Sequence, residues 1–179
     1  MLAQAARRSI MWRHLRAILL LPALATLIVP AALLYLTRSV RVGWGLPGPL
    51  AVAPIFVAGG LIAAGLGLFA WTVRAFAVVG QGTLAPWDPP RRFVASGVYR
   101  YVRNPMITGV ICILLGEAAL VGSLPLLGWA GAFLLANAVY IPFVEERDLE
   151  RRFGEDYRAY QRQVPRWVPR RPVSTGAER

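Results

Sequence analysis

The stretch of sequence that decides the fold runs from Pro105 to Val144 and reads PMITGVICILLGEAALVGSLPLLGWAGAFLLANAVYIPFV. A turn signal, Gly122-Ser123-Leu124-Pro125, divides it into two apolar blocks, 105–121 and 124–144. Each block is long enough to cross a bilayer as a helix, for which about 20 residues are needed. So short a break permits only a tight turn between antiparallel helices. The stretch therefore predicts a helical hairpin embedded in a membrane.

Two further apolar blocks precede the hairpin, at 17–36 and 50–73. The first follows a cluster of arginines, but it is longer than the apolar core of a signal peptide, which favours an uncleaved anchor. Pro22 and Pro30 are expected to bend it. Overall, 56% of the residues are hydrophobic and only 16% are charged, whereas about 25% are charged in a typical soluble protein. The sequence predicts an all-α fold, a polytopic membrane helical bundle of about four transmembrane helices that forms a single domain over 1–179.

The distribution of arginine predicts the orientation. The formal net charge is +11, and all 20 basic residues are arginine. Four arginines precede the first block and four lie in the polar, proline-rich segment 80–104, whereas only two separate the first block from the second. Because positive residues stay on the cytoplasmic side, both termini and the 80–104 segment should face the cytoplasm, in an inner or cell membrane. The arginines flank apolar blocks instead of alternating with aromatic residues, so nucleic acid is not a predicted partner.

After Val144 the chain becomes strongly charged and amphipathic. Apolar residues recur there at spacings of three and four, which predicts a helix with one apolar stripe. The stripe consists of Leu149, Phe153, Tyr157, Tyr160 and Val164. Arginines on the opposite face favour a helix that lies on the cytoplasmic membrane surface. We expect this interfacial helix and a basic tail, Arg166 to Arg171, within 145–179, with Gly154 as a candidate interruption.

Candidate site residues gather at the cytoplasmic ends of the hairpin. Because the chain crosses the membrane and returns, Asn104-Pro105 and Glu145-Glu146 are expected at the same depth, with a cleft between them. Each pair also has an ordinary explanation, since Asn104 suits a helix N-cap and the two glutamates suit a solvated helix end. Glu117 is different, because an acid inside an apolar span is costly and therefore predicts a functional or pairing role. The single Cys and single His exclude a thiolate cluster and a multi-histidine site, so no metal is predicted.

The stretch from Gly80 to Arg170 carries several short motifs in a fixed order. They are SGVYR at 96–100, RNPMITG at 103–109, Glu145-Glu146, and FGEDY at 153–157 followed by Tyr160, Val164, Pro165, Arg166 and Pro169. With this order and spacing the stretch resembles a superfamily of integral membrane methyltransferases, which includes the isoprenylcysteine carboxyl methyltransferases and the phospholipid methyltransferases. The resemblance covers about half of the chain.

The resemblance implies S-adenosylmethionine as the cofactor, bound between the loop before the hairpin and the helix that leaves it. The cofactor contacts that it implies are Gln81, Arg91, Arg92, Phe93, Val94, Tyr99, Asn104, Pro105, Met106, Ile107 and Glu145. Two positions depart from the family pattern, which often has His at position 104 and usually has Tyr at position 107. Asn104 keeps a hydrogen-bonding group, whereas Ile107 removes an aromatic hydroxyl.

The expected reaction is methyl transfer to a lipid or lipid-linked acceptor at the cytoplasmic membrane face. Such a transfer needs alignment of the nucleophile and the methyl group rather than a metal hydroxide. A carboxylate acceptor like that of an isoprenylcysteine needs an arginine to hold it, for which Arg103 is the candidate. An amine acceptor like that of a phospholipid must lose a proton, for which Glu146 and Glu117 are the candidate bases. The residues alone do not choose between these acceptors.

Two other functions stay open from the sequence. The first is an NADPH-dependent reductase of isoprenoids or sterols, because some such enzymes share a similar C-terminal membrane architecture. It would need a site for the ribose phosphate of the nicotinamide cofactor, and the sequence shows no recognisable one. The second is a non-catalytic membrane subunit with the same fold, for which the departures at Asn104 and Ile107 are the support.

Overall fold

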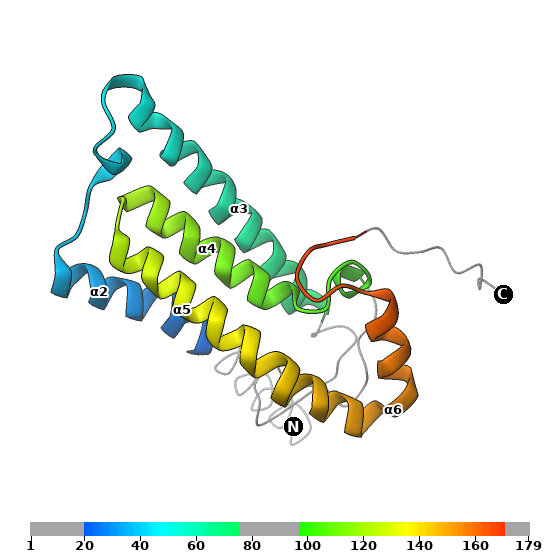
Figure 1. Ribbon diagram of the computed structural model, residues 1–179. Coiled ribbons are helices and arrows are strands. Elements are labelled where there is room, and N and C mark those ends of the chain that lie inside the picture. The colour runs from blue at the N-terminus through cyan, green and yellow to red at the C-terminus, as the bar shows by residue number, and fades with distance from the viewer. Residues whose placement is uncertain (1–19, 76–96, 171–179) are drawn as a thin grey trace, which may run out of the picture.

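The computed structural model describes residues 20–75 and 97–170 (Figure 1). All regular secondary structure in these two segments is helical, which confirms the predicted class. The elements in chain order are η1 (Leu24–Ile28), α2 (Val29–Thr37), η2 (Val42–Gly45), η3 (Gly48–Ala51), α3 (Val52–Ala75), η5 (Gly97–Arg100), α4 (Pro105–Val121), α5 (Leu124–Tyr140), η6 (Ile141–Glu145) and α6 (Glu146–Gln163).

Within 20–75 and 97–170, three helical runs are long and apolar enough to cross a membrane. They are Leu20–Gly45, Gly48–Ala75 and Leu124–Gln163, and the apolar helix Pro105–Val121 is shorter. Long apolar helices of this kind satisfy every backbone polar group internally, as the hydrocarbon core requires. The protein is therefore an integral membrane protein with a helical bundle. We treat 20–37, 52–75, 105–121 and 124–144 as its membrane-spanning segments.

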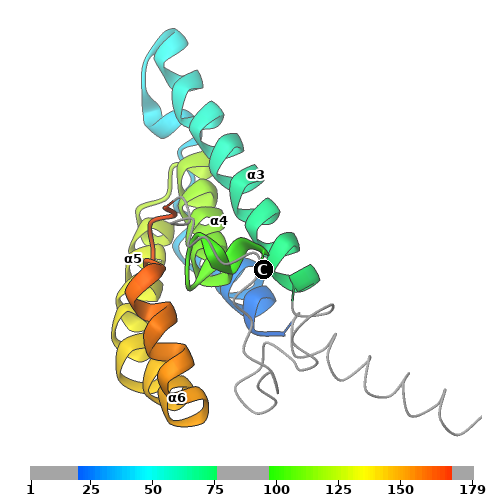
Figure 2. The same ribbon diagram turned by 90° about the vertical axis from the view of Figure 1, so that its right-hand side faces the viewer.

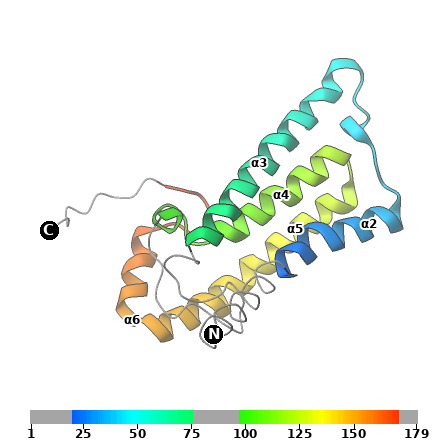
Figure 3. The ribbon, with the colours of Figure 1, turned by 180° about the vertical axis from the view of Figure 1, so that it is seen from behind.

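Helix α4 lies between α3 and α5 at the centre of the bundle (Figures 1 and 3). It approaches α3 closely where Gly65 faces Gly109. A Cβ atom at Gly65 would lie 2.6 Å from the carbonyl oxygen of Gly109, and one at Gly109 would lie 2.9 Å from that of Gly65. Neither position has room for a side chain, so the two glycines set the distance between the helices.

The first span contains a π-helical turn where proline removes a backbone donor. The π-helical turn η1 would pair the Ala25 carbonyl with the N–H five residues later, but that residue is Pro30, which has none. The indole Nε1 of Trp129 in α5 donates to this carbonyl instead, at 2.9 Å. Ala25 also packs in a small core with Val110 and Leu114 of α4. The hydrogen bond and this core together fix the first span against the hairpin.

Helix α5 continues through the π-helical turn η6 into α6, so the chain remains helical beyond the apolar span. At Gly154 the backbone leaves the helical region, with φ 55° and ψ −127°. The chain turns back there toward the N-terminal end of α4 (Figures 1 and 2). The predicted apolar stripe closes this corner, because Tyr157, Tyr160 and Val164 are buried together. Gly154 is therefore the bend that returns the C-terminal residues to the bundle.

Candidate cofactor-binding site

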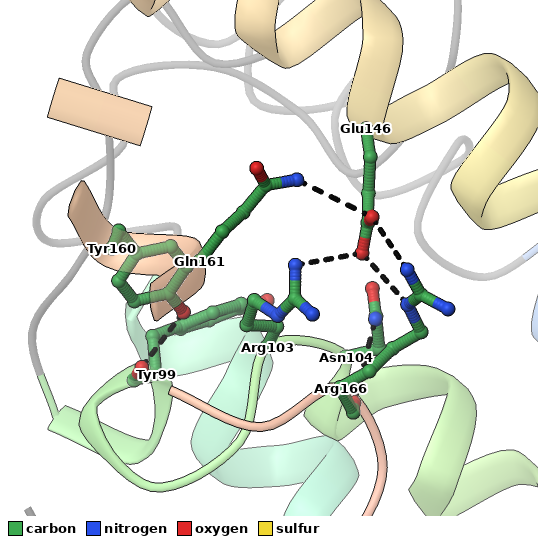
Figure 4. Close-up of polar contacts among 7 residues, drawn as sticks. All are labelled: Tyr99, Arg103, Asn104, Glu146, Tyr160, Gln161 and Arg166. Atoms are coloured by element: carbon green, nitrogen blue, oxygen red, sulfur yellow. Dashed lines mark hydrogen bonds and ion pairs between the residues drawn. The ribbon is translucent and has the colours of Figure 1, made fainter. Parts of the chain in front are cut away.

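The candidate site lies at the N-terminal end of α4, where the loop before the hairpin meets the returning chain. We call residues 160–170 the C-terminal strap. The Tyr160 hydroxyl donates to the Tyr99 carbonyl at 2.7 Å, and two main-chain hydrogen bonds join the same segments (Figure 4). These run from Arg103 N to Pro165 O at 2.9 Å and from Arg170 N to Tyr101 O at 3.0 Å. The strap therefore fixes the loop that leads into α4.

Glu146 is the charged centre of this contact and is only 7% exposed. Its Oε1 atom lies 2.9 Å from Nη1 of Arg103, and the Arg166 guanidinium binds both carboxylate oxygens, at 2.9 and 2.8 Å. The Gln161 side chain also donates to Oε2, at 3.3 Å. A buried carboxylate is tolerated when it is paired and hydrogen-bonded in this way. Figure 4 shows these donors converging on the one carboxylate.

Glu145 differs from its neighbour in having no such partners. It is half-buried, and none of the ion pairs between described residues includes it. Burial raises the pKa of the Glu145 carboxyl, and the charge of Glu146 raises it further. A half-buried carboxylate that none of the described residues pairs is costly at the end of a span, and a cationic ligand would lower that cost.

The first turn of α4 keeps its backbone donors uncapped. Asn104 occupies the N-cap position and Pro105 the first helical position, as predicted, but the Asn104 side chain makes no capping hydrogen bond. Its Nδ2 donates instead to the carbonyl of Arg166, at 3.4 Å. The N–H groups of Met106 and Ile107 precede the first intrahelical hydrogen bond of α4, and neither donates to the Asn104 side chain. These donors and the helix dipole suit an anionic group.

Tyr99 lies at the same place, near the last turn of α3. Burial raises the pKa of its phenol, and the nearby Tyr160 and Glu145 raise it further, so the group stays protonated. The Thr72 hydroxyl of α3 lies beside this phenol, and Thr72 is fully buried. The α3 helix thus helps to place the loop residues of the site.

The structure brings together most of the predicted site residues that it describes. Tyr99, Arg103 and the 104–107 turn meet Glu146 and Glu145 at one end of α4. The remaining predicted cofactor contacts, Gln81, Arg91, Arg92, Phe93 and Val94, lie outside the described residues.

Glu117 does not join this group. It lies twelve residues after Pro105, about 18 Å further along the helix axis at 1.5 Å per residue. Its Oε2 atom is buried and makes no hydrogen bond to any described residue. The predicted functional carboxylate of the apolar span is therefore far from the candidate cofactor contacts.

Three residues of this arrangement were not predicted as parts of a site. Gln161 and Arg166 bind Glu146, and Thr72 lies beside Tyr99. Arg166 could have been identified from the sequence, because it belongs to the last motif of the family resemblance, but its charge also fits the predicted basic tail. Thr72 could not, since a threonine near the end of a span is common.

Comparison with known proteins identifies the family. No curated protein matches the chain. The family model for phospholipid methyltransferase matches residues 53–156, which is more than half of the chain and includes α3, the hairpin, Glu145 and Glu146. The match ends before the C-terminal strap. The chain therefore belongs to the phospholipid methyltransferase family.

Proposed function

We propose that the protein transfers the methyl group of S-adenosylmethionine to a lipid or lipid-linked acceptor at the cytoplasmic membrane face. The observation that carries this proposal is the difference between two adjacent glutamates at the end of the hairpin. Glu146 is bound by Arg103, Gln161 and Arg166, whereas Glu145, which lies near Tyr99, has no ion pair with any residue of 20–75 or 97–170.

The residues present fit the charges of this cofactor. S-adenosylmethionine carries a carboxylate, an ammonium group and a sulfonium. The Glu145 carboxylate suits the ammonium group, and the N–H groups of Met106 and Ile107 suit the carboxylate. The Tyr99 ring offers an aromatic face for the cationic sulfur. The family assignment independently favours a methyl donor.

The cofactor supplies an activated methyl group on a good leaving group, so the chain has to bind and align rather than activate. Glu145 and the first turn of α4 would hold the donor, and the strap would keep this end of α4 in place. Since Glu146 already receives hydrogen bonds on both oxygens, we assign it to holding Arg103 and Arg166 rather than to taking a proton. Arg103 would then act by positioning the loop, because its charge is paired with Glu146.

A lipid acceptor suits the surface beside Glu145. The side chains just before it are apolar and exposed, among them Val139, Phe143 and Val144. In a bilayer these side chains face the hydrocarbon, so an acceptor anchored there by its own chains would bring its polar group to the depth of Glu145. Both an isoprenylcysteine carboxylate and a phospholipid amine meet this description. Purified protein with labelled cofactor and separate lipid classes would show which of them is methylated.

The cytoplasmic assignment follows from the arginine distribution and has its own test. Arg41 and Arg151 are both exposed and lie toward opposite ends of the bundle. In a Cys112→Ser background, cysteines at these two positions should react with a membrane-impermeant reagent from opposite sides. Labelling from the same side would contradict the four-span orientation.

The proposed function is tested by the affinity for the cofactor. Glu145→Gln should weaken S-adenosylmethionine binding by about 1.5–3 kcal/mol, roughly ten-fold or more, because a charge-assisted hydrogen bond is lost. Glu150→Gln is the matched control, since Glu150 pairs with the exposed Arg158 on the surface of α6. Calorimetry on the detergent-solubilised protein gives both values. Equal effects of the two substitutions, or thermal stabilisation by NADPH and not by S-adenosylmethionine, would contradict the proposal.

A further inference from the structure

The C-terminal strap lies beyond the part of the chain that the family model matches, yet it supplies many of the contacts at the candidate site. The match ends at residue 156, and the strap begins at residue 160. From the strap come the Tyr160 hydroxyl, the Pro165 carbonyl, the Arg170 amide and the whole of Arg166. The question is whether any strap residue does more than add stability.

Arg166 contacts two site residues with two different parts of itself. Its Nε and Nη2 atoms bind the two oxygens of Glu146, a bidentate geometry that fixes the plane of the carboxylate. Its main-chain carbonyl accepts the Nδ2 proton of Asn104. Figure 4 shows Arg166 joined to Glu146 through its guanidinium and to Asn104 through its main chain. Arg166 therefore orients both Glu146 and Asn104, the N-cap residue of α4.

The contact with Asn104 has a consequence for the first turn of α4. An asparagine at this position ordinarily turns its side chain onto the N–H groups of the next residues and caps the helix. Here the amide is directed to the strap, and no side-chain cap forms. With the Asn104 amide held at the Arg166 carbonyl, the N–H groups of Met106 and Ile107 are not capped by the Asn104 side chain.

The contact with Glu146 can be separated from simple charge compensation. Arg103 lies 2.9 Å from the same carboxylate, so the charge of Glu146 stays paired when Arg166 is lost. What disappears is the bidentate orientation, which lysine cannot supply because its ammonium is a point charge. Glu145 is the preceding residue of the same helical run, so holding Glu146 in place also holds the backbone from which the Glu145 side chain projects.

We propose that Arg166 is a positioning residue for cofactor binding, which holds Asn104 away from the first turn of α4 and holds Glu146 so that Glu145 faces the ligand. This inference rests on the proposed function. It assigns to the strap, outside the matched family segment, a part in the affinity for S-adenosylmethionine that simple anchoring of the C-terminus would not have.

The test compares Arg166→Met and Arg166→Lys with Arg162→Met. Arg162 is exposed, lies four residues earlier and makes none of the contacts described above. Both substitutions of Arg166 should raise the Kd for S-adenosylmethionine by about ten-fold, and Arg162→Met should leave it unchanged. The KM for S-adenosylmethionine should rise more than turnover at saturating cofactor falls, because Arg166 acts on the binding of the cofactor and not on the reacting groups. Full affinity in Arg166→Lys, or in Arg166→Met, would overturn the positioning role.

A second measurement keeps the inference separate from the proposed function. In a Glu146→Gln background, Arg166→Met should change the melting temperature without cofactor less than it does in wild type, because the two residues share one interaction. Additive effects would overturn the contact itself. A wild-type protein that binds no S-adenosylmethionine would refute the proposed function and the positioning role with it, whereas the melting temperatures would still decide the contact.

Discussion

The two ends of α4 differ in how their backbone groups are hydrogen-bonded by the rest of the protein. At its C-terminal end, the loop between α2 and α3 closes the helix with neutral groups, since the Arg41 amide donates to the Val121 carbonyl at 2.7 Å and the Trp44 indole donates to the Ala119 carbonyl at 3.1 Å. At its N-terminal end, charged side chains gather around Glu146, yet Asn104 does not cap the first turn and Glu145 has no ion pair within the part of the chain that the structure describes. Satisfied helix ends stabilise a fold, whereas unsatisfied groups held in place by their surroundings are typical of binding sites. The difference separates the structural end of the bundle from the candidate functional end.

The largest expected effect on stability is at the C-terminal end of α4, which we call the closed end because the loop between α2 and α3 covers it. Gly122 has φ 62°, and a Cβ atom there would overlap the Arg41 carbonyl oxygen. Gly122→Ala should cost about 1–2 kcal/mol for the left-handed backbone alone, and the overlap adds to this. The melting temperature in detergent should fall sharply, while Gly128→Ala should not lower it, because nothing lies within 4 Å of a Cβ atom at Gly128. Similar melting temperatures for the two variants would show that the loop does not close the hairpin as described.

At the N-terminal end of α4, near Glu145, acidification should weaken cofactor binding. Burial and the charge of Glu146 raise the pKa of Glu145, so this carboxylate takes up a proton at a higher pH than an ordinary glutamate, whose pKa is about 4.3. Protonation removes the negative charge that we assign to the cofactor ammonium group. The Kd for S-adenosylmethionine should therefore rise as the pH falls through the raised pKa. The same titration of Glu145→Gln gives the control, and an equally steep rise there would assign the pH dependence to another group.

A smaller effect is expected from Trp44→Phe, again at the closed end. The substitution removes the indole donor to the Ala119 carbonyl and should cost about 1 kcal/mol of stability. Cofactor affinity should not change, because the substitution is at the far end of α4. Tyr35→Phe is a suitable control, since it removes a polar group from a ring that is 76% exposed. A loss of cofactor affinity in Trp44→Phe would show that the two ends of α4 are coupled.

The smallest effect is expected from Glu117→Gln. Glu117 lies four residues before the closed end of α4, and a neutral amide costs less to bury than a carboxylate. We expect cofactor affinity and turnover within about two-fold of wild type, and no loss of thermal stability. Binding and methylation rate should be measured on the same preparation. Reduced turnover with unchanged affinity would instead place Glu117 at the acceptor, and loss of both would make it a support of the fold.

Much of the fold could be predicted because a bilayer leaves few choices. An apolar stretch of about 20 residues has to be helical, since only a helix satisfies its backbone groups without partners. The Gly122-Ser123 break then determined the hairpin, and the hairpin alone placed Asn104 and Glu145 at the same end of the bundle. For Glu117 the cost of an acid inside a span is visible in the sequence, whereas its role stays a prediction, and its position along α4 puts it away from the cofactor contacts expected at the first turn.

Only the tertiary structure decided that Glu146, of the two adjacent glutamates, is the one that other described residues pair. Adjacent residues of a helix point about 100° apart, so Glu145 and Glu146 cannot share one environment, but the sequence does not say which of them faces inward. The π-helical turn η6 and the bend at Gly154 settle this by bringing Arg166 back from twenty residues further along the chain to meet Arg103 at Glu146. Contacts between such distant residues depend on the angles of two bends, and local sequence patterns determine the existence of helices better than the angles between them.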